Sequence, residues 1–167
     1  LITAYKNAGG YVDMEWAFAQ SDIDIKDRIP RTRIDLVLVD TIPNEQGLND
    51  IYLAELKVGT VATEGTSGTI DHVEKTFKLI NTEKACQDLK EDVTNIINVK
   101  SELGIYTGTA KQFNLADKPK MMLILAYRGE EEYKRLLKDS TAAQKKAKEL
   151  GMDEIKVVMH NALIKLD

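Results

Sequence analysis

The sequence has little of what builds a disulfide framework, a zinc site or a membrane span. Its 167 residues include one cysteine, two histidines and three prolines. Cys86 alone cannot form an internal disulfide, which favours a reducing, cytoplasmic environment. Its place on the apolar side of a predicted helix indicates a core position. His72 and His160 lie far apart with no Cys or His partner at ligand spacing, so zinc is not indicated. No apolar run approaches the roughly 18 residues that span a bilayer, and no signal-like leader opens the chain, so no membrane partner is expected.

The charge balance also lacks a strong sign. The 23 basic and 27 acidic residues leave a net charge of −4. This balance argues mildly against a protein that coats nucleic acid, because Lys and Arg drive phosphate binding. A nuclease is not excluded, since metal-binding carboxylates add negative charge while a local basic patch guides the substrate. The length fits one domain over residues 1–167, and the start at Leu1 rather than Met leaves open a fragment of a longer protein.

The first part of the chain has the patterns of a short helix and three strands. Residues 1–8 read as a helix stopped by two glycines. Alternating or β-branched runs predict strands over residues 11–19, 33–40 and 51–58. Polar, proline- or glycine-containing stretches predict loops over residues 21–32, 41–50 and 59–68.

The second part alternates helices and strands. From Thr69 the apolar residues fall at helical spacing, and the phase slips between Ile80 and Cys86. This stretch is either one long helix or two helices that break near Asn81-Thr82. The apolar run over residues 121–127 predicts a buried central strand. Residues 130–150 read as a helix capped by Gly151, and residues 155–160 as a last strand. The order predicts an α/β fold in which helices flank a mixed sheet.

Three charged residues on two neighbouring strands form the most informative pattern. Glu55 and Lys57 stand two positions apart, so they point to the same face of their strand. If the strands pair as a hairpin, Asp35 can lie opposite Glu55. Two carboxylates that close repel each other unless a cation lies between them, and a hard divalent ion such as Mg²⁺ prefers oxygen ligands. Lys57, beside the ion, could orient or deprotonate a water and stabilise charge on a phosphate.

The competing interpretation of Glu55 and Lys57 is a salt bridge on a solvated face of the sheet. Their strand is otherwise apolar, with Ile51, Leu53 and Val58 around them. Buried charges are costly unless they are paired or bound to metal. The presence of Asp35 on the preceding strand favours the metal site over the solvated pair.

The segments Arg33-Ile34-Asp35-Leu36-Val37-Leu38-Val39 and Ala54-Glu55-Leu56-Lys57-Val58 resemble the motifs of the PD-(D/E)XK nuclease superfamily. The order of elements is also similar to the αβββαβ core of that restriction-endonuclease-like fold, over most of residues 1–127. The resemblance implies Mg²⁺-dependent hydrolysis of DNA, with Mn²⁺ as a substitute ion. It implies that Asp35, Glu55 and the Leu56 carbonyl are metal ligands and that Lys57 is the catalytic lysine. Ile34 stands where many members have proline.

Other residues fit the resemblance less closely. Some branches carry a glutamine and then a tyrosine on the helix after the lysine; Gln87 matches the glutamine, while Glu91 replaces the tyrosine. Gln87 either contacts the site or is a solvated helix residue. Many members have a first-helix glutamate, but residues 1–8 contain no acid and Glu15 falls on a predicted strand. The missing acid and the acidic net charge keep a second hypothesis open, an inactive module that binds nucleic acid or a protein.

Basic residues just before Asp35 are the candidates for contacts to DNA. Arg31 and Arg33 could guide a phosphate backbone without reading its sequence, or belong to a solvated loop. Cutting both strands often needs two such sites, so a homodimer is a further expectation. Additional domains of a larger restriction or repair protein are another.

Overall fold

The computed structural model describes residues 11–18, 32–59, 68–104 and 113–162. The helix predicted over residues 1–8, most of the first polar loop and most of the Gly/Thr/Ser loop lie outside these ranges. The described elements are, in order, β1 (Tyr11–Phe18), β2 (Thr32–Val39), β3 (Ile51–Val58), α2 (Thr69–Ile80), α3 (Glu83–Glu102), β4 (Lys120–Tyr127), α4 (Glu130–Glu149) and β5 (Lys156–Asn161). Each strand and helix expected within the described ranges is present, with ends shifted by a residue or two.

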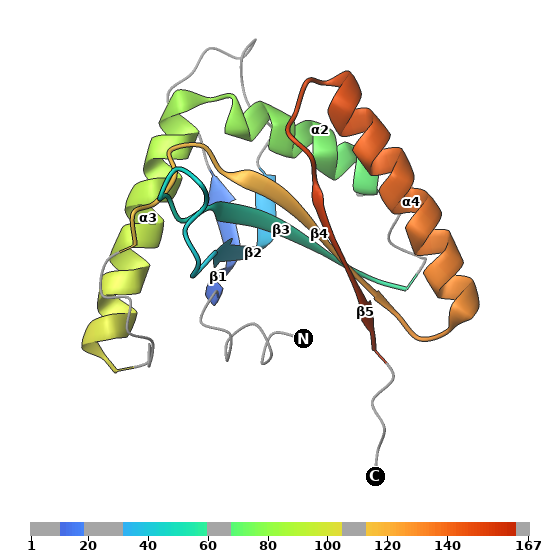
Figure 1. The fold of residues 1–167 in the computed structure, drawn as a ribbon, viewed down its shortest axis with the longest axis horizontal. Coiled ribbons are helices and arrows are strands. Elements are labelled where there is room, and N and C mark those ends of the chain that lie inside the picture. The colour runs from blue at the N-terminus through green and yellow to red at the C-terminus, as the bar shows by residue number, and fades with distance from the viewer. Residues whose placement is uncertain (1–10, 19–31, 60–67, 105–112, 163–167) are drawn as a thin grey trace.

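The strands form one mixed sheet in the order β1-β2-β3-β4-β5 (Figure 1). β1, β2 and β3 pair antiparallel, whereas β3, β4 and β5 pair parallel. Antiparallel neighbours can follow each other through short loops, while parallel neighbours need a crossover, supplied here by helices. The prediction of an α/β fold with a mixed sheet is therefore confirmed.

β4 is a buried interior strand, as its unbroken apolar sequence predicted, although the middle strand of the sheet is β3. It lies between β3 and β5, and every residue from Met121 to Ala126 is buried. An alternating pattern is absent because both of its faces are covered. Truncating one of its fully buried side chains, such as Leu123, is expected to cost about 2–5 kcal/mol of folding free energy.

The helical stretch after Thr69 consists of two helices, which resolves the alternatives left by the sequence. The Asn81 side chain donates to the Phe77 carbonyl, and the Thr82 hydroxyl donates to the Lys78 carbonyl, both at 2.9 Å. Thr82 itself has an extended backbone, and its carbonyl accepts from the Cys86 N–H in the first turn of α3. Two polar side chains thus satisfy the end of α2 and turn the chain into α3. Cys86 is buried, as expected.

The end of α4 follows the glycine signal. Gly151 has φ +73°, a left-handed conformation that suits glycine. The Met152 N–H donates to the Ala147 carbonyl, and the Gly151 N–H donates to the Lys148 carbonyl. These two hydrogen bonds together form a Schellman motif, which ends the helix and directs the chain into β5.

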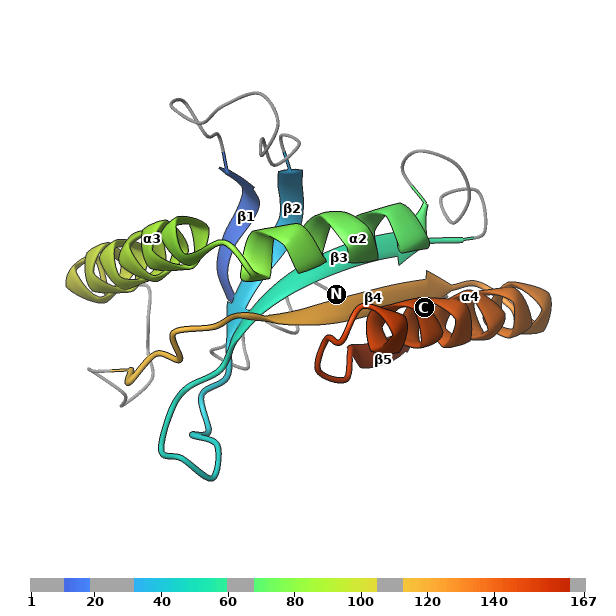
Figure 2. The ribbon, with the colours of Figure 1, turned by 90° about the horizontal axis from the view of Figure 1, so that it is seen from above.

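The three described helices pack on the sheet through two apolar clusters. Ile51 and Leu53 of β3 belong to a cluster with Leu79 of α2 and Leu89 of α3. Leu123 and Leu125 of β4 belong to a cluster with Val73 of α2 and Leu136, Ala143 and Ala147 of α4. α2 contacts both other helices and runs along β3, as Figure 2 shows. Its first turn therefore lies at the end of β3 that carries Glu55 and Lys57.

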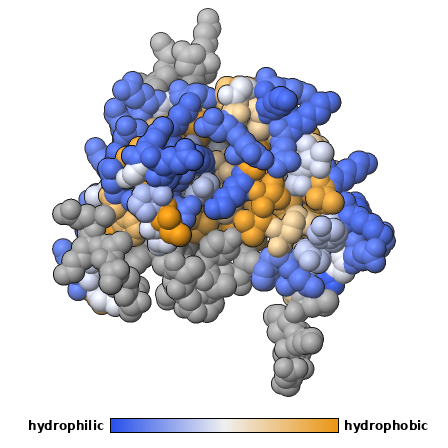
Figure 3. All heavy atoms as spheres, viewed as in Figure 1, coloured by the Kyte–Doolittle hydropathy of each residue, from blue (hydrophilic) through white to orange (hydrophobic). Residues whose placement is uncertain are grey.

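The surface of the described residues is mostly polar. Figure 3 shows hydrophilic side chains over the helices and an apolar area where β5 crosses the view. In the described part of the chain, no helix is both long enough and apolar enough to cross a membrane.

Candidate functional site

The site begins where β2 and β3 stop pairing through their backbones. Their ladder runs from Val39↔Ile51 to Leu36↔Ala54 and ends there. At the next position the Asp35 carboxylate, rather than a strand carbonyl, accepts from the Leu56 N–H at 2.9 Å. This bond anchors the Asp35 side chain on β3, beside Glu55. The two strands therefore bring together the acids that the hairpin prediction placed opposite each other.

Glu55 and Lys57 form a buried ion pair on the helix-covered face of β3. Lys57 Nζ lies 2.8 Å from Glu55 Oε1, and each side chain is only 6% exposed. Alternation along the strand places both on the face that Ile51 and Leu53 bury, as the sequence predicted. The pair is thus not the solvated salt bridge that competed with the metal site. A buried ion pair contributes little net stability, because desolvation offsets the attraction between the charges.

His72 is the member of the site that the sequence interpretation missed. It lies in the first turn of α2, where its N–H donates to the Gly68 carbonyl. Its Nδ1 lies 3.1 Å from Glu55 Oε2, and its side chain is 17% exposed. Both oxygens of Glu55 are therefore engaged, one by Lys57 and one by His72. Sequence spacing to another His or Cys could not reveal this contact. The available signal was the position of the histidine, which is the fourth residue of the helix that follows the strand carrying Glu55 and Lys57.

The two carboxylates have different electrostatic environments. Burial raises the pKa of Asp35, and the nearby charge of Glu55 raises it further, against the hydrogen bond from Leu56. Burial would also raise the pKa of Glu55, but hydrogen bonds from His72 and Lys57 outweigh it and lower the pKa below its ordinary value. Glu55 is therefore stabilised as a carboxylate, whereas the charged form of Asp35 is disfavoured. A cation placed beside Asp35 would relieve this penalty.

Of the remaining predicted residues, Leu56 belongs to this centre, whereas Arg33 and Gln87 are exposed at the surface. Arg33 is exposed on β2, opposite Ala17 of β1, and Arg31 lies outside the described residues. Leu56 is half-buried between Glu55 and Lys57, with its N–H bound to Asp35. Gln87 is exposed on α3, and its amide donates to Glu83 one turn earlier. This is the position of a solvated helix glutamine, and its bond runs along α3 rather than to the site.

The donor chemistry of the centre fits a divalent cation. Asp35 and Glu55 supply carboxylate oxygens from adjacent strands, and His72 adds a ring nitrogen. Within the described residues, no group of three or more His, Cys, Asp and Glu side chains is already arranged to hold a metal ion. The two contacts to Glu55 show where positive charge is favoured. An ion bound there would take the place that Lys57 or His72 now holds against one carboxylate oxygen.

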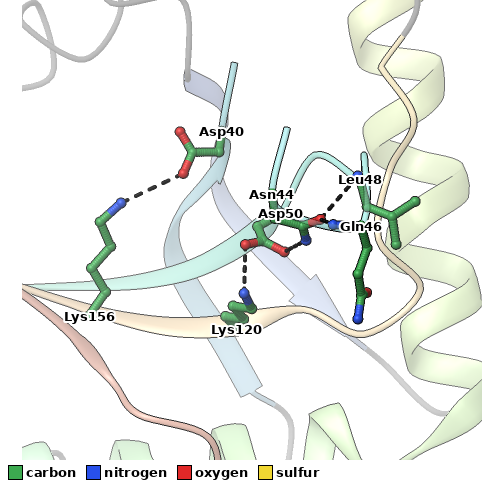
Figure 4. A network of polar contacts seen from close by, with 7 residues as sticks. All are labelled: Asp40, Asn44, Gln46, Leu48, Asp50, Lys120 and Lys156. Carbon is green, nitrogen blue, oxygen red and sulfur yellow. Dashed lines mark hydrogen bonds and ion pairs between the residues drawn. The ribbon is translucent and has the colours of Figure 1, made fainter. Parts of the chain in front are cut away.

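A second carboxylate–lysine pair lies at the start of β3 and is purely a loop anchor (Figure 4). Asp50 accepts from Lys120 Nζ at 2.6 Å and from the Asn44 amide at 2.9 Å. Asn44 Oδ1 in turn accepts from the backbone N–H groups of Gln46 and Leu48. The network ties the β2–β3 loop to the first residue of β4. Its polar groups are used to hold one turn.

Comparison with known proteins yields no relative of this chain. No protein-family model, no curated protein and no solved structure matches it. The α/β fold is therefore established by the described sheet and helices, and the chemistry has to be inferred from the residues at the end of β3.

Proposed function

We propose that this chain is a metal-dependent deoxyribonuclease with a restriction-endonuclease-like αβββαβ core. The observation that carries the proposal is that half-buried Asp35 lies beside the buried Glu55–Lys57 pair where the ladder between β2 and β3 ends. Buried charges are costly, and two carboxylates beside a lysine are expected where a reaction uses them. The same three residues carry the sequence resemblance to PD-(D/E)XK nucleases.

Mg²⁺, or Mn²⁺ in its place, would be held by Asp35, Glu55 and the Leu56 carbonyl. Both ions accept carboxylate and carbonyl oxygens. When bound, such an ion lowers the pKa of a coordinated water and polarises the scissile phosphate.

The protein's own groups would position the reactants. The Leu56 N–H holds the Asp35 carboxylate at a fixed place on β3. Lys57, now paired with Glu55 at 2.8 Å, would donate hydrogen bonds to the attacking water or to the phosphate. Arg33, exposed on the same strand as Asp35, would contact the DNA backbone. Positioning and charge stabilisation by such groups supply most of the rate enhancement in phosphoryl chemistry.

Cleavage of plasmid and end-labelled oligonucleotides tests the proposal. The purified chain is incubated with Mg²⁺, Mn²⁺ or EDTA, alongside Asp35→Ala, Glu55→Gln and Lys57→Met. We expect cleavage with either ion, none in EDTA, and losses of at least about a hundredfold in each variant. Lys120→Met, on β4 beside the start of β3, is the matched control and should cleave like the wild type. Full activity in the Glu55 and Lys57 variants would sink the site assignment.

A specific observation favours a second function, an inactive nuclease-fold module that binds nucleic acid or a protein. Lys57 and His72 occupy both oxygens of Glu55, so the chain itself neutralises the charge that a metal would neutralise. Titration calorimetry separates the two proposals. Heat of binding with millimolar Mg²⁺ or Mn²⁺, lost in Asp35→Ala, supports the nuclease. No binding of either ion supports the inactive module.

A further inference from the structure

His72 contacts Glu55 directly, although the packing of α2 on the sheet does not depend on this contact. It reaches Glu55 from a different element, α2, and its side chain is largely shielded from water at 17% exposure. The buried side chains of Val73 and Leu79 already pack α2 onto the sheet. The Leu56 N–H anchors Asp35 next to Glu55, so the His72 ring contacts the acid that is adjacent to this anchor.

The distance between His72 and Glu55 is compatible with two ligands of one ion. Two donor atoms bound at about 2.1 Å and at a right angle lie about 3.0 Å apart. The observed separation of His72 Nδ1 and Glu55 Oε2 is 3.1 Å. A direct hydrogen bond has the same length, so the distance alone leaves both roles open. Imidazole nitrogen is a common metal ligand, so an ion that took the place of the hydrogen bond at Glu55 Oε2 would have His72 Nδ1 within reach.

We propose that His72 is a nitrogen ligand of the ion held by Asp35 and Glu55, and that the site therefore prefers transition-metal ions to Mg²⁺. This inference rests on the proposed metal site. Mg²⁺ takes oxygen ligands almost exclusively, whereas imidazole nitrogen suits ions such as Co²⁺ and Ni²⁺ and is accepted by Mn²⁺. A mixed nitrogen and oxygen site binds these ions more tightly along the series Mn²⁺, Co²⁺, Ni²⁺.

Pulsed electron paramagnetic resonance of the Mn²⁺-loaded protein reports the ligand directly. We expect a ¹⁴N coupling typical of a bound imidazole in the wild type, replaced by a ¹⁵N coupling when the histidines are ¹⁵N-labelled. This comparison needs no substitution, so it does not depend on the folding of a variant. His72→Gln should lose the coupling, whereas His160→Gln, altered on β5, should keep it.

Affinities measured by calorimetry provide the second readout. His72→Gln should weaken Co²⁺ and Ni²⁺ binding by at least about tenfold and Mg²⁺ binding by less. Circular dichroism and thermal melting show whether the variant is folded. A Mn²⁺ complex without nitrogen coupling in the wild type would overturn the role of His72 and leave the carboxylate site standing. If the wild type binds none of the ions, the proposed metal site and this inference both fail.

Discussion

A carboxylate–lysine pair lies near each end of β3, and the two pairs are used differently. At the start of the strand, Asp50 and Lys120 join segments far apart in sequence and, through Asn44, fix a loop. Near its end, Glu55 and Lys57 are two residues apart on one strand, so their 2.8 Å contact closes no loop. The contact between Glu55 and Lys57 therefore does not do what the Asp50–Lys120 contact does, which is to join distant segments of the chain.

Burial sharpens the contrast. The Lys120 side chain is 37% exposed and keeps part of its hydration, whereas the Lys57 side chain is 6% exposed. Removing a charge from water costs several kcal/mol, and the attraction within a buried pair offsets that cost only in part. The buried Glu55–Lys57 pair therefore costs folding free energy, and a function would explain why it is there. The more exposed Asp50–Lys120 pair contributes to stability.

The largest expected difference between the two ends is in catalysis. Lys57→Met removes the proposed donor to water or phosphate and should reduce DNA cleavage by about a thousandfold, within the usual range of 10²–10⁴. Metal affinity should persist or rise, because Nζ no longer competes for Glu55 Oε1. Cleavage rates and Mn²⁺ calorimetry measure both. Lys120→Met is the control, and equal losses in the two variants would break the comparison.

Removing both charges of the Glu55–Lys57 pair should abolish activity but should not lower the free energy of unfolding. Glu55→Leu alone leaves the Lys57 ammonium buried without that carboxylate and should cost about 3–5 kcal/mol. Adding Lys57→Met should restore stability to the wild-type level or raise it above that level by about 1–4 kcal/mol. Urea unfolding of the single and double variants in EDTA measures the difference. A double variant no more stable than Glu55→Leu would show that the pair supports the fold.

At the start of β3, removing a charge should only weaken the fold. Asp50→Ala leaves the Asn44 amide and Lys120 without their acceptor and should cost about 1–3 kcal/mol in urea unfolding. Asp50→Asn keeps one acceptor oxygen and should lose less. Mn²⁺ affinity should stay at the wild-type value in both variants. A change in that affinity would mean that the two ends of β3 are coupled.

Much of the fold could be predicted because its signals are local. The apolar run of β4 and the glycine after α4 placed those elements within a residue or two. The break between α2 and α3 stayed undecided, because side-chain bonds of Asn81 and Thr82 decide it and the apolar pattern does not show them.

The site was predictable only where strand geometry dictates it. Alternation fixed Glu55 and Lys57 on one face, and a hairpin brought Asp35 near them. The anchoring of Asp35 on the Leu56 N–H needs the strands to separate after Leu36, which composition does not reveal. His72 was missed because the docking of α2 on the sheet is a tertiary event. Gln87 matched a motif by spacing. The turn at Asn81-Thr82 separates α3 from α2, and the Gln87 side chain is exposed on α3, where it donates to Glu83.

The smallest expected effect concerns Asp35, and it tests directly whether a charged acid at this site lowers the free energy of unfolding. Because burial raises its pKa, the folded protein binds the proton more readily than the unfolded chain does. The penalty for the charged form is thus present at neutral pH and disappears as pH falls through the raised pKa. Asp35→Asn can still accept from the Leu56 N–H, so in EDTA it should be more stable than the wild type at pH 7. The gain should shrink in acid, while Mn²⁺ binding at neutral pH is lost. Urea unfolding at both pH values checks the sign; a less stable Asp35→Asn at pH 7 would place Asp35 with Asp50, among the residues that hold the fold.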